Sequence, residues 1–196
     1  MAVLQTGLAK SLAEDYTIDQ SLRFDDGDVS KLSRTFTSVG DRTAWTISLW
    51  FKLGNIQGGT TGQRWLSAGD DPSYGDLKLY GGQIYFNPSS SGASLVSTRK
   101  FRDPSAWYHL VGVYDSDNVT SGDRIRLYIN GTRETDFGTA TYPSQGTDSS
   151  HINTAILHRI STYNGTAEPI DGYLAEYYFI DGQALDASSF GETDDT

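Results

Sequence analysis

The fold is decided by the stretch Trp45-Thr46-Ile47-Ser48-Leu49-Trp50-Phe51-Lys52, in which apolar and polar side chains alternate. Successive side chains of a strand point to opposite faces, so a period of two separates this segment into two faces. Trp45, Ile47 and Leu49 share one face with Phe51, and the other face carries Trp50 among polar neighbours. The pattern predicts a β-strand with the first face in a hydrophobic core.

Comparable short segments follow along the chain and are separated by glycine-containing turns. Leu77–Tyr80 and Gln83–Asn87 flank Gly81-Gly82, which predicts a β-hairpin. Trp107–Tyr114 is apolar on both faces, which is typical of a central strand covered on each side. Further strands are expected at Arg64–Ser67, Arg124–Asn130, Thr154–Ser161 and Tyr173–Asp181. Strands of this length and spacing predict an all-β protein, an antiparallel two-sheet β-sandwich of the jelly-roll type.

Composition and charge exclude several classes of function. The chain has 196 residues and no cysteine, which excludes disulfides, cysteine-ligated metals and thiol catalysis. Asp and Glu outnumber Lys and Arg by 25 to 15, giving a net charge of -10, so we expect no nucleic-acid partner. No apolar run approaches the roughly 20 residues of a membrane span, so we expect no membrane insertion.

We divide the chain into three parts. Residues 1–19 form an N-terminal arm in which Leu4, Leu8 and Leu12 recur at a helical spacing; a docked arm and a loosely packed terminus both remain open. Residues 20–191 form the sandwich domain, and 192–196 an acidic tail. The start of the arm lacks the apolar stretch of a secretory signal peptide, so none is expected.

Four segments together resemble the concanavalin A-like, or laminin-G-like, jelly roll. Ser21–Asp28 resembles the family's opening strand and turn, and Trp45–Lys52 its T-I-S-x-W strand. Trp107–Asp115, followed by Leu127–Gly131, resembles the paired central strands, and Asp171–Phe179 the closing strand. The resemblance extends from Ser21 to about Phe190 and implies the same sandwich that the alternation predicts.

The resemblance also implies a biological location for the protein. Phe179–Leu185, taken with the N-terminal arm, is most similar to versions carried on tailed-bacteriophage virions. We therefore expect a protein of the virion surface that is assembled in the host cytoplasm, a reducing compartment compatible with the absence of cysteine.

The resemblance implies glycosidases among the relatives, so paired carboxylates were sought. Laminarinase-like relatives place their acids as Glu-x-Asp-x-x-Glu or Glu-x-Asp-x-Glu on one strand, and this chain has no such run. His109 alternates with core positions and is expected to pack at the core edge. Counted from Asp115, an EF-hand would need Gly at the sixth position and Glu at the twelfth, where this chain has Thr120 and Arg126, so Asp115–Asp123 is interpreted as a polar hairpin tip. We therefore predict no enzyme and no catalytic residue.

Calcium is the one cofactor considered, and only as a weak ligand. Where many relatives have Asp-Glu in the closing strand this chain has Ala175-Glu176, which removes a usual calcium ligand. The remaining candidate is the adjacent pair Asp70 and Asp71, for which a solvated loop is the alternative.

Aromatic side chains that alternate away from the core or lie beside loops are the candidate contact residues. They are Trp50, Tyr80, Tyr85, Tyr128 and Tyr163. Such side chains suit protein contacts, sugar rings or plain sheet surface. Three functions follow: a non-enzymatic virion surface protein that decorates or stabilises the particle through contacts with itself or other virion proteins, a receptor-recognition module that binds host surface glycan, and, third, a glycoside hydrolase.

Overall fold

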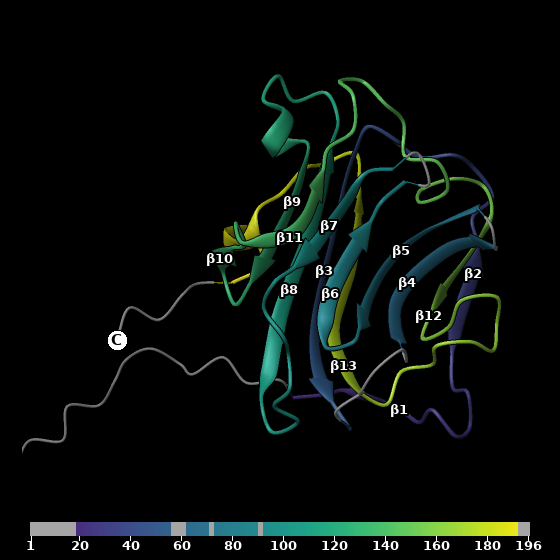
Figure 1. Ribbon diagram of the computed structural model, residues 1–196. Helices are drawn as coiled ribbons and strands as arrows, with labels where there is room; N and C mark the ends of the chain where they lie inside the picture. The colour runs from purple at the N-terminus through teal and green to yellow at the C-terminus, as the bar shows by residue number, and fades with distance from the viewer. Residues whose placement is uncertain (1–18, 56–61, 71–72, 90–91, 192–196) are drawn as a thin grey trace, which may run out of the picture.

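The computed structural model describes residues 19–55, 62–70, 73–89 and 92–191, which form two antiparallel β-sheets stacked face to face (Figure 1). The six-stranded sheet has the order β1 (Leu22–Phe24), β13 (Gly172–Asp181), β3 (Ala44–Leu53), β8 (Trp107–Asp115), β9 (Ile125–Ile129), β10 (Thr132–Arg133). The seven-stranded sheet has the order β11 (Phe137–Thr141), β7 (Ser94–Ser97), β6 (Gln83–Asn87), β5 (Ser73–Tyr80), β4 (Gly62–Asp70), β12 (Leu157–Ile160), β2 (Leu32–Thr35). Two 3-10 turns, η1 (Ser121–Asp123) and η2 (Ala187–Ser189), are the helical elements of these residues. The predicted two-sheet sandwich is confirmed.

The core lies between the sheets and is centred on β3. Trp45, Ile47 and Leu49 are fully buried, as their alternation predicts. The Trp45 ring stacks on Tyr114 of β8 at 5.5 Å and meets Phe86 of the opposite sheet edge-on at 5.8 Å. Aromatic contacts of these geometries stabilise a core beyond the area they bury, so this cluster locks the two sheets together.

The outer face of the six-stranded sheet is covered by the chain that follows β13. Thr46 Oγ1 donates to the carbonyl of Gln183 at 2.7 Å and accepts from the backbone N–H of Leu185 at 2.9 Å. Beyond these bonds, Ala187 lies against Val111 and Val113 of β8, which are fully buried on the side away from the main core. This cover explains why β8 is apolar on both faces, as predicted.

Two predicted turns take the expected form. Gly81 and Gly82 have φ of 58° and 82°, and the pairing of Tyr80 with Gln83 closes the hairpin between β5 and β6. Residues 116–124 connect β8 to β9 as a polar tip, tied down by an ion pair of 3.2 Å between Asp115 and Arg126. The expected hairpin tip is therefore present, and its carboxylate is engaged by arginine.

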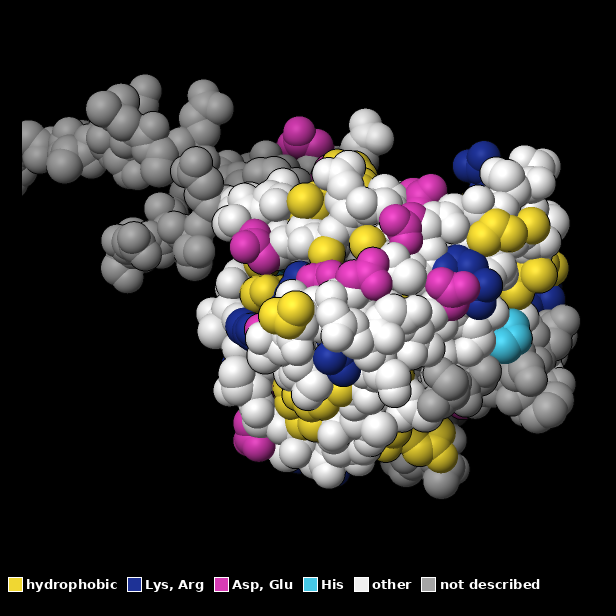
Figure 2. All heavy atoms as spheres, turned by 90° about the horizontal axis from the view of Figure 1, so that it is seen from above, with side chains coloured by type: hydrophobic (Ala, Val, Ile, Leu, Met, Phe, Trp, Pro, Cys, Tyr) yellow, Lys and Arg dark blue, Asp and Glu magenta, His cyan; other side chains and the backbone are white. Residues whose placement is uncertain are grey.

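The surface carries charges of both signs. Figure 2, which views the molecule from above, shows Asp and Glu side chains interspersed with Lys and Arg and with small apolar patches. Among the described residues, no helix is long and apolar enough to cross a membrane.

Candidate functional site

A network of charged side chains lies on the outer face of the seven-stranded sheet. Leu77 and Leu79 of β5 point into the core, so Asp76 and Lys78 point outward. Antiparallel register places Arg64 of β4 opposite Lys78 and Asn87 of β6 opposite Asp76. Residues far apart in sequence are thereby brought to one spot.

Asp76 is the centre of this network. It is fully buried, accepts hydrogen bonds from the Arg64 guanidinium and from Asn87 Nδ2 at 2.7 Å, and forms an ion pair with Lys78 Nζ at 3.2 Å. Arg64, also buried, donates from Nε to Glu168 at 2.5 Å. Buried charges are tolerated when each has such partners, and the result is a rigid polar patch within the sheet.

Aromatic rings surround the network. Tyr80 and Tyr85 are half-buried on the outer face, with ring centroids 5.7 Å apart and planes at 83°. Lys78 Nζ lies between them, 5.6 Å from the Tyr80 centroid and 5.7 Å from the Tyr85 centroid. The Arg64 guanidinium lies 4.5 Å from the centroid of Tyr163. Three of the five predicted contact residues therefore meet around one charged cluster.

The loop after β12 carries Tyr163 and Glu168 to this face. Ser161 N–H donates to the carbonyl of Arg64 at 2.9 Å, and Arg64 N–H donates to that of Glu168 at 3.1 Å. Between them Asn164 and Gly165 have φ of 46° and 93°, conformations that Asn and Gly adopt at low cost. The Asn-Gly turn thus reverses the direction of the loop and places the side chains of Tyr163 and Glu168 over β4.

The other two predicted contact residues lie on the opposite side of the molecule. Trp50 and Tyr128 belong to the outer face of the six-stranded sheet, where Tyr128 packs against Val111 and Val113. Trp50 is half-buried and stacks on His109, with centroids 5.0 Å apart and planes at 23°. The five residues therefore do not form one surface, and Tyr128 is part of a small second cluster.

His109 supports Trp50 from below. Its Nε2 lies 2.9 Å from Ser48 Oγ, and burial lowers the pKa of the imidazole below 6.5. The ring is buried, as expected of a residue at the core edge, although it packs on the outer face of its sheet. A hydrogen-bonded ring in this place holds the Trp50 indole in position.

Metal-binding residues are described only in part. Asp70 is the last residue of β4, but its side chain lies outside the described residues, as does Asp71. Ala175 is buried in β13 and offers no ligand oxygen. Within the described ranges, no group of three or more His, Asp or Glu side chains is arranged to hold a metal ion. The weak calcium site at Asp70 and Asp71 stays a prediction.

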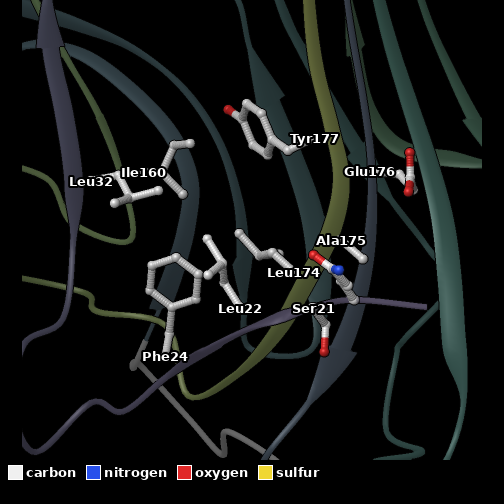
Figure 3. A pocket seen from close by; sticks show the side chains of 10 residues that line it. Ser21, Leu22, Phe24, Leu32, Ile160, Leu174, Ala175, Glu176 and Tyr177 are labelled. Carbon is white, nitrogen blue, oxygen red and sulfur yellow. The ribbon is translucent and has the colours of Figure 1, made fainter. Parts of the chain in front are cut away.

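An apolar pocket of about 220 Å³ opens at the edge of the sandwich between β1 and β2 (Figure 3). Leu22, Phe24, Leu32 and Ile160 converge on it from opposing strands. Tyr177 closes one side, with its hydroxyl donating to the Trp65 carbonyl at 3.0 Å, and burial raises the pKa of that phenol. Leu22 and Leu32 remain 57% and 48% exposed, so the rim of the pocket is an apolar surface in contact with water.

The amino-acid sequence of the sandwich matches a known family. A family profile described as concanavalin A-like lectin/glucanases superfamily, of the laminin-G type, matches residues 25–189. The chain belongs to this superfamily. The resemblance of its strands to that family is thereby confirmed, while the association with bacteriophage stays a prediction. No curated protein matches the chain.

Solved structures agree on the fold. The binding domain of botulinum neurotoxin serotype G is similar with a TM-score of 0.54 and 14% identity, over 86% of this chain and 40% of that one. Domain 4 of the arabinanase AbnA from Geobacillus stearothermophilus, solved with arabinotriose, is similar with a TM-score of 0.51 and 17% identity, over 83% of this chain and 76% of that one. A pentraxin from Limulus polyphemus is similar with a TM-score of 0.50 and 15% identity, over 78% of this chain and 70% of that one. This chain thus spans less than half of the toxin domain, and at these identities the likeness concerns the fold.

Proposed function

We propose that this protein is a non-enzymatic carbohydrate-binding module that contacts its ligand through the outer face of the seven-stranded sheet. The observation that carries the proposal is the pair Tyr80 and Tyr85, held edge-to-face around Lys78 on a rigid polar base. Sugar rings stack on aromatic faces and hydrogen-bond through their hydroxyl groups. Fixed aromatic and charged groups on strands lose little entropy when they bind.

The charge of this face favours a neutral sugar. The charged groups of the network are Arg64 and Lys78 against Asp76 and Glu168, two positive and two negative, which sum to zero. Arg159 of β12 lies on the same face beside Ser67, where it donates to the Gly69 carbonyl at 3.3 Å. A network without net charge has no long-range attraction of its own for sialic or uronic acids. Since Arg64 binds both carboxylates, we assign neither of them the role of a catalytic acid or base.

Structural relatives support the proposal without deciding it. The arabinanase domain is solved in complex with arabinotriose. Another similar structure, a botulinum neurotoxin DC binding domain, is in complex with SialylT. Both domains share this fold and were solved with a bound ligand, so carbohydrate binding is compatible with this architecture.

A glycan array tests the proposal. We expect the protein to bind neutral oligosaccharides, and Tyr85→Ala to weaken that binding about tenfold or more, equivalent to about 1.4 kcal/mol. Tyr128→Ala is the matched control, because Tyr128 is a half-buried tyrosine on the opposite sheet. Binding that survives Tyr85→Ala, or an array with no bound glycan, contradicts the proposal.

The virion surface role, which the sequence analysis placed first, is the second candidate function, with attachment through protein contacts. It is favoured by the exposed rim of the pocket at the sandwich edge, where Leu22 and Leu32 present apolar surface. We expect Leu22→Ser with Leu32→Ser to leave the fold intact and to reduce incorporation into particles, measured on purified virions. Normal incorporation of that variant, beside a surface control such as Val119→Ser, removes this candidate.

A further inference from the structure

The outer face of the six-stranded sheet contains a cavity that the chain covers on one side only. The cavity measures about 630 Å³, and Ser48, Trp50 and His109 line it together with Tyr178 of β13. Its remaining lining residues are Asp19, Glu176, Ile180, Ser189 and Phe190. Over β8 and β9 the same face is already covered by the segment that ends at Phe190.

The walls of the cavity are formed by aromatic and imidazole rings that contact one another in succession. Trp50 stacks on His109, His109 meets Phe190 at 6.4 Å and 62°, and Phe190 lies 6.3 Å from Tyr178 with planes at 24°. Tyr178 is 44% exposed and belongs to the small group of large hydrophobic side chains that are exposed among the described residues. An aromatic wall beside a covered apolar face is a surface suited to a second covering segment.

The backbone of β13 is distorted to present this wall. The register shifts between Ala175 and Tyr178, and Glu176 has φ of 46°, an uncommon conformation for a residue with a long side chain. The bulge turns Tyr177 into the core and Tyr178 outward, where its hydroxyl donates to the Glu176 carboxylate. Backbone strain that persists within a strand is concentrated at functional and contact sites.

We propose that residues 1–18 of the same chain dock into this cavity, with Leu4, Leu8 and Leu12 against the aromatic wall. Asp19, from which that segment continues, already lines the cavity. Eighteen residues reach at most about 60 Å, whereas the three strands under the cavity span about 10 Å, so length allows several placements.

The chain's own segment is a better occupant than a second copy. Its point of attachment at the cavity gives it an effective concentration in the millimolar range for a short linker. A second copy would also have to offset the translational and rotational freedom lost on association. In a helix, leucines at i, i+4 and i+8 fall on one side, and this spacing in the sequence would suit one aromatic wall.

Cysteine cross-linking tests the proposal directly, because the natural chain has no cysteine. Leu8→Cys combined with Ser189→Cys places one thiol in the segment and one in η2, at the cavity margin. Leu8→Cys with Ser121→Cys is the matched control, since Ser121 is also an exposed serine in a 3-10 turn but lies at the polar hairpin tip. A short bis-maleimide is applied to both full-length proteins at several protein concentrations.

We expect the Ser189 pair to form an intramolecular product at least about tenfold faster than the Ser121 pair, independent of protein concentration. Equal rates for the two pairs would show a segment that does not dock, and would overturn the proposal. A dimeric product that grows with concentration would instead assign the cavity to the segment of a second copy.

A second measurement keeps all rings and the fold unchanged. The full-length triple variant Leu4→Ser, Leu8→Ser and Leu12→Ser changes no residue of the sandwich. We expect tryptophan fluorescence to become more accessible to acrylamide in this variant, because Trp50 lines the cavity. Identical quenching of the variant and the natural protein would overturn the proposal even if both cysteine pairs reacted.

Discussion

Removal of the buried carboxylate at Asp76 is the perturbation whose size the structure defines best. Asp76 and Arg64 are 0% and 2% exposed, so Asp76→Ala leaves a guanidinium buried with Glu168 as its described carboxylate partner. Breaking a buried ion pair by removing one partner costs about 3–5 kcal/mol. Because Glu168 still pairs with Arg64, we expect a loss at the lower end of this range, about 3 kcal/mol of the free energy of unfolding. For a chain of this length that corresponds to a decrease in Tm of about 6–12 °C.

Urea denaturation followed by tryptophan fluorescence measures this loss. Asp148→Ala is the control, because its pair with Arg42 has the same type of contact at 3.0 Å but is half-exposed, and such pairs contribute about 0–1 kcal/mol. The double variant Arg64→Met with Asp76→Leu should recover most of the stability, since apolar groups replace both charges. A cost below about 1 kcal/mol for Asp76→Ala, equal to that of the control, would refute the reasoning that this network is rigid and buried.

Three further outcomes are expected. Trp50→Ala should leave the domain folded in circular dichroism, because its indole lies outside the main core. The same change should slow the intramolecular cross-link between Leu8→Cys and Ser189→Cys, because it removes part of the wall against which residues 1–18 are proposed to dock, and an unchanged rate would contradict this. Millimolar calcium should raise Tm over chelator by less than about 2–4 °C, equivalent to about 1 kcal/mol, and a rise of many degrees abolished by Asp70→Ala would contradict this. Burial lowers the pKa of His158 below 6.5. Between this lowered pKa and 6.5 the unfolded chain binds more protons than the folded one, so the free energy of unfolding should decrease as pH falls below 6.5. A His158→Gln variant, compared by urea midpoint at pH 7 and 5.5, should lose less stability on acidification than the natural protein.

The strands that the sequence predicts are those with a buried face. Alternation of apolar and polar side chains marks β3 and β9, because one face of each packs in the core. β8 is marked instead by apolar residues on both faces, because its outer face is covered as well. β2 was not predicted: all four of its residues are exposed, so no alternation of apolar side chains marks it. Its pairing with β12 depends on tertiary contact rather than on a local pattern.

The candidate site was predicted only in its aromatic half. Alternation along the strands identified Tyr80 and Tyr85 as outward, and the structure places them side by side because β5 and β6 form a hairpin. The charges between them were missed, although Asp76 and Lys78 alternate with Leu77 and Leu79 and could have been read from the same pattern. No local signal could have revealed that Arg64 joins them, since this contact depends on the register between β4 and β5.

The two outer faces of the sandwich are completed in different ways, and this difference separates their expected roles. On the seven-stranded sheet, buried charges satisfy one another within the strands, so the tyrosines above them need no further cover. On the six-stranded sheet, the apolar residues Val111 and Val113 depend on a segment from outside the sheet. A face that satisfies its own polar groups is available to an external ligand, whereas a face that needs cover is occupied by chain. Ligand contact is therefore expected at Tyr80 and Tyr85, and chain contact at Trp50.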